Sequence, residues 1–329
     1  MATLLDSLTQ TVTPQMTEQI GKMLDVENSQ VTQGVNMAAP VLLAAIGQKA
    51  SAPNGADEVL GSLKEDVGNP FDAVASGQGD AILNQLFGVG AKKVASWIEN
   101  TTGINIAPFL PIVAPLVMNA IQNAVKSQNL DGAGLTTLLI NENAAYAKAQ
   151  PQLASEINAA LDAGQNVNER AERIRARFTD DEWNTLASTP TLAGYAVMMS
   201  ALSGPVGLNK EISALLEAQS ELGALVEPDS LVGLVSREIY SPEQISALGA
   251  NRGNAMNLTR DACLDVVKIL NEKETHEEIV AYKKFVVDVA TRVASTAIDG
   301  GIMSIGGKPI NDDEKMTLDL IAAALAYQP

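Results

Sequence analysis

Residues 37–50 read MAAPVLLAAIGQKA, and residues 112–125 read IVAPLVMNAIQNAV. The two segments align without a gap when one is shifted by 75 positions. Identical aligned pairs include Ala39 and Ala114, Pro40 and Pro115, Ala45 and Ala120, Ile46 and Ile121, Leu60 and Leu135, and Leu63 and Leu138. This order of identities predicts an internal duplication in the first half of the chain. Each copy is expected to hold one apolar helix bent by its proline, because proline removes a backbone hydrogen bond from a helix interior.

The composition of the 329-residue chain predicts an all-α protein. Hydrophobic residues make up 46% of the chain and aromatic residues only 4%, so the apolar mass is mostly alanine, leucine, valine and isoleucine. Alanine and leucine are among the strongest helix formers. No region shows several segments with the two-residue hydrophobic period of strands. We therefore expect a multihelical array, in which an internally duplicated N-terminal half is followed by a helical C-terminal domain.

Three parts are expected along the chain, because its length suits roughly two domains of about 150 residues. Residues 1–142 form a helical domain that contains the duplication. Residues 143–177 form connecting helices, since large apolar residues are sparse there and Pro151 and Gly164 interrupt the pattern. In this part Asn166 and Glu169 have the spacing of a capping box, which would start a helix. Residues 178–329 form the second helical domain.

Four helix starts support the helical prediction for the second domain. Each combines a capping residue with a glutamate or proline at the expected spacing. They are Phe178 to Trp183, Tyr240 to Ile245, Thr275 with Glu278, and Asn311 to Glu314. In the first, Thr179 is expected to cap the helix while Glu182 bonds back to it. Phe178 is expected to pack on Trp183 as a hydrophobic staple.

The charge of the chain argues against binding to nucleic acids. The net charge is −17, and no arginine occurs before Arg170. Nucleic-acid binding depends on lysine and arginine contacts to phosphates. Arg170, Arg173 and Arg177 share one helix face and could form a basic stripe. Because Glu169 and Glu172 lie beside them, a solvated, salt-bridged helix is the preferred interpretation.

A membrane span and an exported location are not expected. The longest mostly apolar stretch, residues 104–121, contains Pro108, Pro111 and Pro115. Its 18 positions would barely cross a hydrocarbon core of about 30 Å even as an unbroken helix. The N-terminal sequence MATLLDSLTQ lacks the basic start and long apolar run of a secretion signal. We therefore expect a cytoplasmic protein.

Few residues suit catalysis. His276, the only histidine, falls among glutamates in the first turn of an expected helix, which argues against a catalytic role. Cys263, the only cysteine, lies at helical spacing from Val266 and Leu270, so a buried position is expected rather than a reactive thiol. The glycine-rich segment 300–309 lacks the spacing and the preceding strand of a phosphate loop, and it predicts an ordered loop between helices. No catalytic and no cofactor-binding residue is assigned.

Two acidic clusters are the remaining candidates for a ligand site. They are Asp180-Asp181-Glu182 and Asp312-Asp313-Glu314. Clustered carboxylates can hold calcium or magnesium. Carboxylates at a helix N-terminus are also explained by the helix dipole alone, and capping is the preferred interpretation. Metal binding by the clusters is left open, and no cofactor is expected.

Both halves contain segments that resemble known families. The first half resembles the YidB-like bacterial family, a domain of unknown function, over about residues 1–140. The segments that carry this resemblance are residues 82–88 (ILNQLFG), 102–104 (TGI), 110–117 (LPIVAPLV) and 135–139 (LTTLL). The second half is loosely similar to TerB-like tellurite-resistance domains, through residues 178–183 and 300–324. Both resemblances imply a helical fold, and some TerB-like domains are thought to bind metal on an acidic surface.

The sequence favours a non-enzymatic protein that acts by self-association or as a scaffold. Its helix-packing stripes and its many small and aliphatic residues stand beside the absence of a catalytic set. The expected partner is a second copy of the chain, in a homo-oligomer. The alternative is a metal-linked stress-response protein that binds divalent cations through the acidic clusters.

Overall fold

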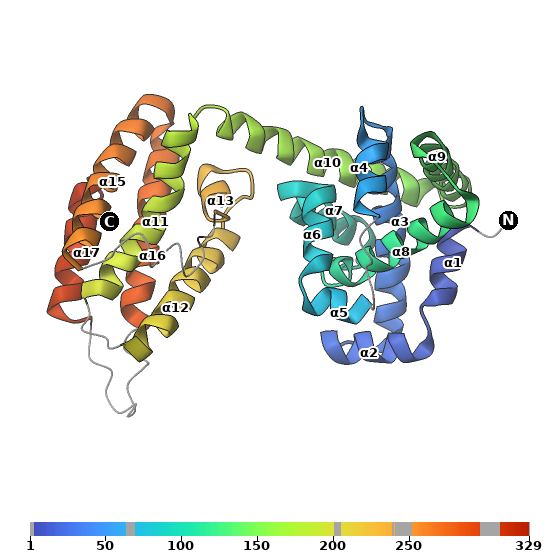
Figure 1. Ribbon diagram of the computed structural model, residues 1–329, viewed down its shortest axis with the longest axis horizontal. Helices are drawn as coiled ribbons and strands as arrows, with labels where there is room; N and C mark the ends of the chain where they lie inside the picture. Colours follow the sequence, from blue (N-terminus) through green and yellow to red (C-terminus); the bar gives the residue numbers. More distant parts are fainter. Residues whose placement is uncertain are drawn as a thin grey trace. The chain divides into compact units, whose positions relative to one another are not determined.

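The computed structural model describes residues 3–63, 70–200, 205–238, 240, 252–296 and 310–328. Over these residues the regular secondary structure is entirely helical, without a strand (Figure 1). The all-α prediction is therefore confirmed. Contacts divide the chain into two compact units, unit 1 from Met1 to Glu169 and unit 2 from Arg170 to Pro329. The three-part boundaries expected from the sequence stay a prediction.

Unit 1 is built around α3, a helix of 24 residues. Its elements are α1 (Leu4–Thr11), α2 (Pro14–Leu24), α3 (Asn28–Ser51), α4 (Gly55–Ser62), α5 (Pro70–Ala75), α6 (Gln78–Phe87), the 3₁₀ turn η1 (Gly88–Gly90), α7 (Ala91–Thr102), α8 (Leu110–Gln128), α9 (Gly132–Ala149) and α10 (Pro151–Arg175). Every residue from Met37 to Leu43 is buried. A helix that is apolar on all sides must be surrounded, and α3 contacts α1, α2, α4, α6, α8 and α9.

The two prolines of the expected duplication both lie inside helices that contact each other, Pro40 in α3 and Pro115 in α8. Proline has no N–H, so each releases the carbonyl four residues earlier from its helical hydrogen bond. For Pro115 this is the Pro111 carbonyl, and a Cβ at Gly79 would lie only 2.0 Å from its oxygen. The glycine therefore lets α6 approach α8 at this point. The duplication itself stays a prediction.

Helix α10 corrects the break that was expected within residues 143–177. It runs without interruption through Gly164 and ends at Arg175. Asn166 and Glu169 consequently lie inside the helix, and the capping box predicted for them is wrong. Packing of α10 against its neighbours outweighs the weak local tendency of one glycine to end a helix.

Gly164 has a packing role that its sequence context does not reveal. A Cβ at Gly164 would lie 2.6 Å from Cγ2 of Val94 on α7. A Cβ at Gly90 would lie 2.3 Å from the carbonyl oxygen of Gly164. Real Cβ atoms do not come so close to other heavy atoms, so the two glycines together allow α10 to lie directly against η1 and α7.

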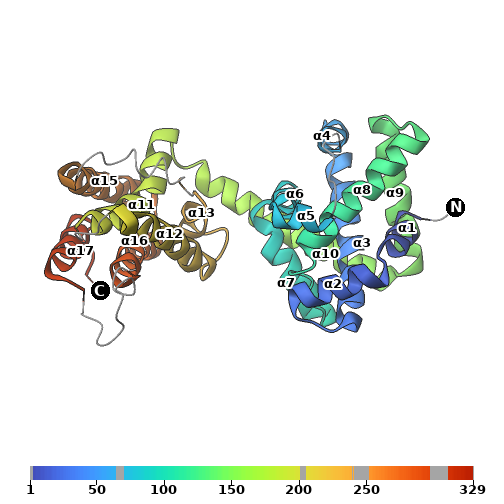
Figure 2. The same cartoon turned by 60° about the horizontal axis from the view of Figure 1, so that its bottom comes forward.

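Unit 2 is likewise built around one buried helix, α11. Among its described residues, the helices after α10 are α11 (Asp180–Ser200), α12 (Pro205–Ala224), α13 (Leu231–Val235), α15 (Arg252–Lys273), α16 (His276–Thr296) and α17 (Asp312–Ala324). Residues Thr189 to Met198 are all buried. Helix α11 contacts α12, α15, α16 and α17, which surround it in Figure 2. A single central helix therefore organises each unit.

The helix starts expected for the second half are confirmed where the structure describes them. The Thr179–Glu182 and Asn311–Glu314 pairs each exchange both bonds of a capping box. In the Thr275–Glu278 pair, the Glu278 N–H donates to Thr275 Oγ1 at 3.4 Å. The start expected at residues 240–245 and the loop expected at residues 300–309 lie outside the described residues, apart from Tyr240.

Pro190 interrupts the hydrogen-bond ladder of α11 in the middle of the unit 2 core. It cannot donate to the Leu186 carbonyl, which lies four residues earlier. The hydroxyl of Tyr282 on α16 donates to that carbonyl at 2.6 Å, and Tyr282 is fully buried. A side chain from a second helix therefore replaces the bond that proline removes.

Candidate functional site

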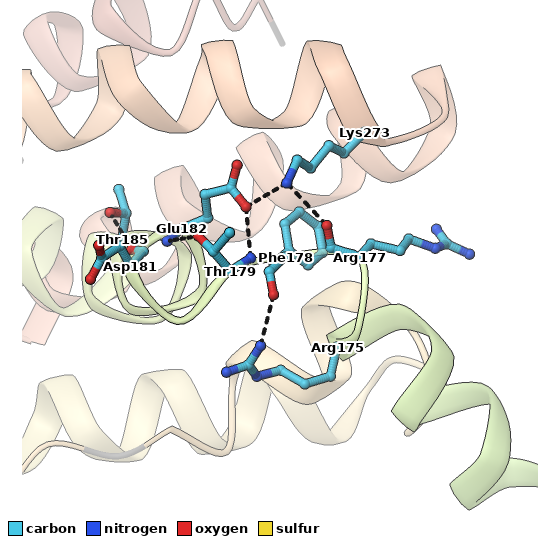
Figure 3. Close-up of polar contacts among 8 residues, drawn as sticks. All are labelled: Arg175, Arg177, Phe178, Thr179, Asp181, Glu182, Thr185 and Lys273. Carbon is cyan, nitrogen blue, oxygen red and sulfur yellow. Dashed lines mark hydrogen bonds and ion pairs between the residues drawn. The ribbon is translucent and has the colours of Figure 1, made fainter.

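The first acidic cluster lies where α10 gives way to α11, beside the last residue of α15 (Figure 3). The Glu182 carboxylate accepts the Thr179 backbone N–H at 2.7 Å and forms an ion pair with Lys273. The Lys273 ammonium also donates to the Arg177 carbonyl at 3.0 Å and lies 5.7 Å from the ring centroid of Phe178. Lys273, followed by the Thr179 backbone, holds the pKa of Glu182 below its usual value. This carboxylate is therefore engaged in closing the corner between helices.

Aromatic packing completes the same corner. The rings of Phe178 and Trp183 lie 6.0 Å apart between centroids, which confirms the expected staple. The Arg175 guanidinium lies 5.0 Å from the Trp183 ring centroid and forms an ion pair with Asp180. The indole N–H of Trp183 donates to Glu238 at 3.0 Å. Asp180 and Glu182, two carboxylates of the first acidic cluster, thus stabilise the tertiary structure through ion pairs.

The second acidic cluster caps α17. The Asn311 N–H donates to the Glu314 carboxylate at 2.9 Å, and the Glu314 N–H donates to Asn311 Oδ1 at 2.8 Å. Glu314 is only 2% exposed, whereas Asp312 and Asp313 are exposed in the first turn. Over the described residues, which include both clusters, no three His, Cys, Asp or Glu side chains gather into a group that could hold a metal ion. Capping explains Glu182 and Glu314 without a ligand.

His276 and Cys263 do not form a catalytic pair. His276 is exposed at the first position of α16. Cys263 is buried in the unit 2 core together with Val266 and Leu270, as expected from the sequence. Burial raises the pKa of its thiol to about 12. Because only the thiolate is a good nucleophile, Cys263 has a structural role.

Two of the three arginines of the expected helical stripe pair with residues outside α10. Arg170 forms an ion pair with Asp229, which follows α12. Arg177 lies beyond the end of α10 and pairs with Glu274 at 2.9 Å. The Glu274 side chain is only 1% exposed. These two arginines are about half exposed and ion-paired, as expected, and their partners lie on other segments of unit 2.

A shallow depression on unit 1 lies between the end of α3 and the middle of α9. It has a volume of about 440 Å³ and is lined by Gly47, Gln48, Ser51, Ala52, Ile140 and Asn143. Ile140 is 52% exposed. A Cβ at Gly47 would lie 2.4 Å from Asn143 Nδ2, so the glycine lets α9 lie against α3. The lining holds no charged side chain, and it combines the polar residues Gln48, Ser51 and Asn143 with Gly47, Ala52 and Ile140.

The exposed position of Ile140 was not among the residues expected from the sequence. Leu135 and Leu139 are both fully buried, four positions apart on one face of α9. Ile140 follows directly, and a helix turns by about 100° per residue, so it cannot share that face. Three consecutive apolar residues at 138–140 cannot all lie on the buried face of one helix. The sequence therefore indicated that one aliphatic side chain of this run would be exposed.

Among the helices that the structure describes, none combines the length and the apolar character needed to cross a bilayer.

The comparisons with known proteins concern unit 1. Residues 6–124 match the family model described as bacterial protein of unknown function (DUF937). The match extends from α1 into α8 and supports the expected bacterial domain of unknown function in the first half of the chain. No curated protein and no solved structure was found to match. The similarity of the second half to TerB-like domains has no support from these comparisons.

Proposed function

We propose that this chain is a non-enzymatic protein that self-associates as a homodimer through the α3–α9 face of unit 1. The observation that carries the proposal is Ile140, which is 52% exposed beside the depression over Gly47, Ser51 and Ala52. One surface therefore holds both a projecting apolar side chain and a hollow lined by small residues.

A two-fold dimer needs a self-complementary patch, because both partners use the same surface, and a projecting side chain beside a hollow is one such arrangement. Ile140 of each copy would enter the hollow of the other. Full burial of an isoleucine side chain stabilises by about 1.5–3 kcal/mol. About half of that remains available at Ile140, since 52% of the residue is exposed, and the contact occurs twice in the dimer. Gln48 and Asn143 supply hydrogen-bonding groups at the rim.

The charge of the chain gives the proposed dimer a distinctive salt dependence. Each copy carries a net charge of −17, so two copies repel each other at low ionic strength. The lining of the depression has no charged residue, so salt screens the repulsion without weakening the contact. Association should strengthen as salt is added, whereas an interface of ion pairs would weaken.

The structural roles of the titratable side chains support the non-enzymatic part of the proposal. Glu182 and Glu314 cap helices, and Cys263 is buried with a raised thiol pKa. A scaffold role, in which the dimer presents two copies of unit 2, is part of the same proposal. So are the cytoplasmic location and the exclusion of nucleic acids that the acidic sequence led us to expect.

Light scattering after size exclusion, across the micromolar concentration range, tests the proposal. The mass should rise with concentration toward that of two chains. Ile140→Asp should weaken association at least about tenfold, because it places a charge in an apolar contact. Leu225→Asp and Met316→Asp are matched controls, since these residues are 81% and 63% exposed in unit 2, and both should leave association unchanged.

Two results would overturn the proposal. One is a strict monomer at every concentration and salt level. The other is association that Ile140→Asp leaves intact, which would remove the α3–α9 face as the interface.

A further inference from the structure

A cavity of about 170 Å³ lies in unit 1 between α1, α3 and α8, with one wall from α9. Seven of its ten lining residues are aliphatic, and none is charged. The three polar lining residues are Thr9, Asn36 and Tyr146. An apolar cavity of about 150 Å³ is large enough to bind benzene. The size and lining therefore suit a small uncharged molecule with an apolar body.

The proline of α3 gives this cavity a hydrogen-bond acceptor. Pro40 cannot donate to the carbonyl four residues earlier, which belongs to Asn36. Among the described residues, no group outside α3 donates to this carbonyl. Asn36 is an exposed residue of the cavity lining, so the carbonyl released from the helix ladder belongs to a residue of the cavity.

Tyr146 adds a second polar group. Its side chain is half-buried at the cavity wall, and burial raises the pKa of its hydroxyl. Within the part of the chain that the structure describes, this hydroxyl makes no hydrogen bond. A hydroxyl both donates and accepts, so a ligand that carries one O–H group can bond to the Asn36 carbonyl and to Tyr146.

We propose that this cavity is a binding site for a small neutral aromatic alcohol, of the size and polarity of a methylphenol. The aliphatic walls take the ring, and the hydroxyl of the ligand bonds to the polar groups of Asn36 and Tyr146. A carboxylate of the same shape is excluded, because the lining has no cation to compensate a buried negative charge.

Helix α1 offers a route into the cavity. It has eight residues and contributes Leu5, Leu8 and Thr9 to the lining, and its C-cap residue Val12 adds a fourth. A helix of this length is not stable alone in water. Its first turn is held by the Leu4 N–H, which donates to Glu142 at 2.9 Å. Thr9 and Asn36 in the lining are already exposed, and local opening of α1 would widen the entrance to the cavity without unfolding α3 or α8.

Three probes with the same ring and methyl group test the proposal on the full chain: 4-methylphenol, toluene and 4-methylbenzoate. Calorimetry and ligand-observed NMR should show one site for 4-methylphenol, weaker binding of toluene and no binding of 4-methylbenzoate. Tyr146→Phe should weaken 4-methylphenol about three- to tenfold, the value of one hydrogen bond, and leave toluene unchanged. Tyr327→Phe, in unit 2, is the control.

A second pair of variants tests the location. Thr9→Trp should abolish binding of both neutral probes, because the larger side chain would fill the cavity. The fold should tolerate this change, since Thr9 is exposed at the cavity and its own hydroxyl bonds only within α1. Thr137→Trp is the matched control, since Thr137 is exposed on α9 and makes the same kind of bond within its helix. The proposal is overturned if neither neutral probe binds, if the carboxylate binds equally well, or if Thr9→Trp leaves binding intact while circular dichroism shows a folded chain.

Discussion

Units 1 and 2 each contain a buried helix with a proline inside it. They differ in whether another element donates a hydrogen bond to the carbonyl that the proline releases. In α11, Pro190 releases the Leu186 carbonyl, and the Tyr282 hydroxyl donates to it at 2.6 Å. In α3, Pro40 releases the Asn36 carbonyl, which receives no donor from another element among the described residues.

The difference follows from the surroundings of each carbonyl. A buried acceptor without a partner costs about 1–3 kcal/mol, so the one inside the unit 2 core must be satisfied. Asn36 is exposed and lines a cavity, where water or a ligand can donate a hydrogen bond to its carbonyl. The position of the proline thus determines which carbonyl loses its helical hydrogen bond. The packing of other helices determines whether that carbonyl accepts a hydrogen bond in the core or remains available to a ligand.

The largest expected effect is on the reactivity of thiols, one in the buried core of unit 2 and one at the cavity of unit 1. Cys263 lies in the same buried cluster as Tyr282, and burial raises its pKa to about 12. At pH 8 the thiolate fraction should fall about a thousandfold relative to the unfolded chain. Labelling with a thiol reagent should therefore be at least that much slower in the folded protein than in urea.

The cavity of unit 1 supplies the contrasting measurement. Ala39→Cys, in a Cys263→Ala background, places a thiol at the lining of the cavity. It should react at least about tenfold faster than Cys263 in the folded protein, because local opening exposes it. Equal protection of the two thiols would show that both sites are sealed and would remove the contrast between them.

The second effect is on stability. Tyr282→Phe leaves the Leu186 carbonyl without its donor and should lower the free energy of unfolding of unit 2 by about 1–3 kcal/mol. In a Pro190→Ala background the loss should shrink by about 1 kcal/mol, because the alanine N–H can donate to Leu186. Urea unfolding followed by Trp183 fluorescence, with Trp97 replaced by Phe, measures unit 2, since these are the two tryptophans of the chain.

Tyr146→Phe is the matched control for this loss. It removes a hydroxyl that makes no hydrogen bond among the described residues, so unit 1 should change by less than about 0.5 kcal/mol. Trp97 fluorescence, with Trp183 replaced by Phe, reports unit 1. Equal losses from the two tyrosines would contradict the proposed difference between the released carbonyls.

Local rules predicted the parts of the fold that depend on neighbouring residues. Capping positions at Thr179 and Asn311 follow from side chains within one turn, and the structure confirms them. The burial of Cys263 follows from helical periodicity. Even the release of the Asn36 carbonyl can be read from Pro40, because the four-residue interval is fixed by the helix.

Rules of this kind fail where a partner comes from a distant segment. Gly164 has the sequence character of a helix end, yet it is small because Gly90 and Val94 lie against it. Nothing in the local sequence connects the hydroxyl of Tyr282 to the Leu186 carbonyl, because the two residues lie on different helices. The surface at Ile140 and the cavity at Tyr146 also depend on how α9 packs, so neither could be located before the tertiary structure was known.

The smallest effect is a difference in pH dependence between the units. Lys273, followed by the Thr179 backbone, lowers the pKa of Glu182 from its ordinary 4.5, so its contribution to unit 2 is complete above that value and is lost as the pH falls through the lowered pKa. Burial, with a smaller contribution from Asp6, raises the pKa of Glu142 in unit 1, against the bond from the Leu4 N–H. Its contribution is therefore present below 4.5 and is lost as the pH rises through the raised pKa.

Glu182→Gln and Glu142→Gln separate these contributions when urea unfolding is measured between acidic and neutral pH. The stability difference between wild type and Glu182→Gln should shrink in unit 2 as the pH falls, because the protonated carboxyl no longer attracts Lys273. In unit 1, acid should instead favour the closed position of α1, because protonation removes the cost of burying the Glu142 charge. If acid instead lowered the contribution of Glu142 to the stability of unit 1, as it does for Glu182 in unit 2, the ionised carboxylate of Glu142 would be the form that holds α1. The cavity beside α1 would then open more readily in acid.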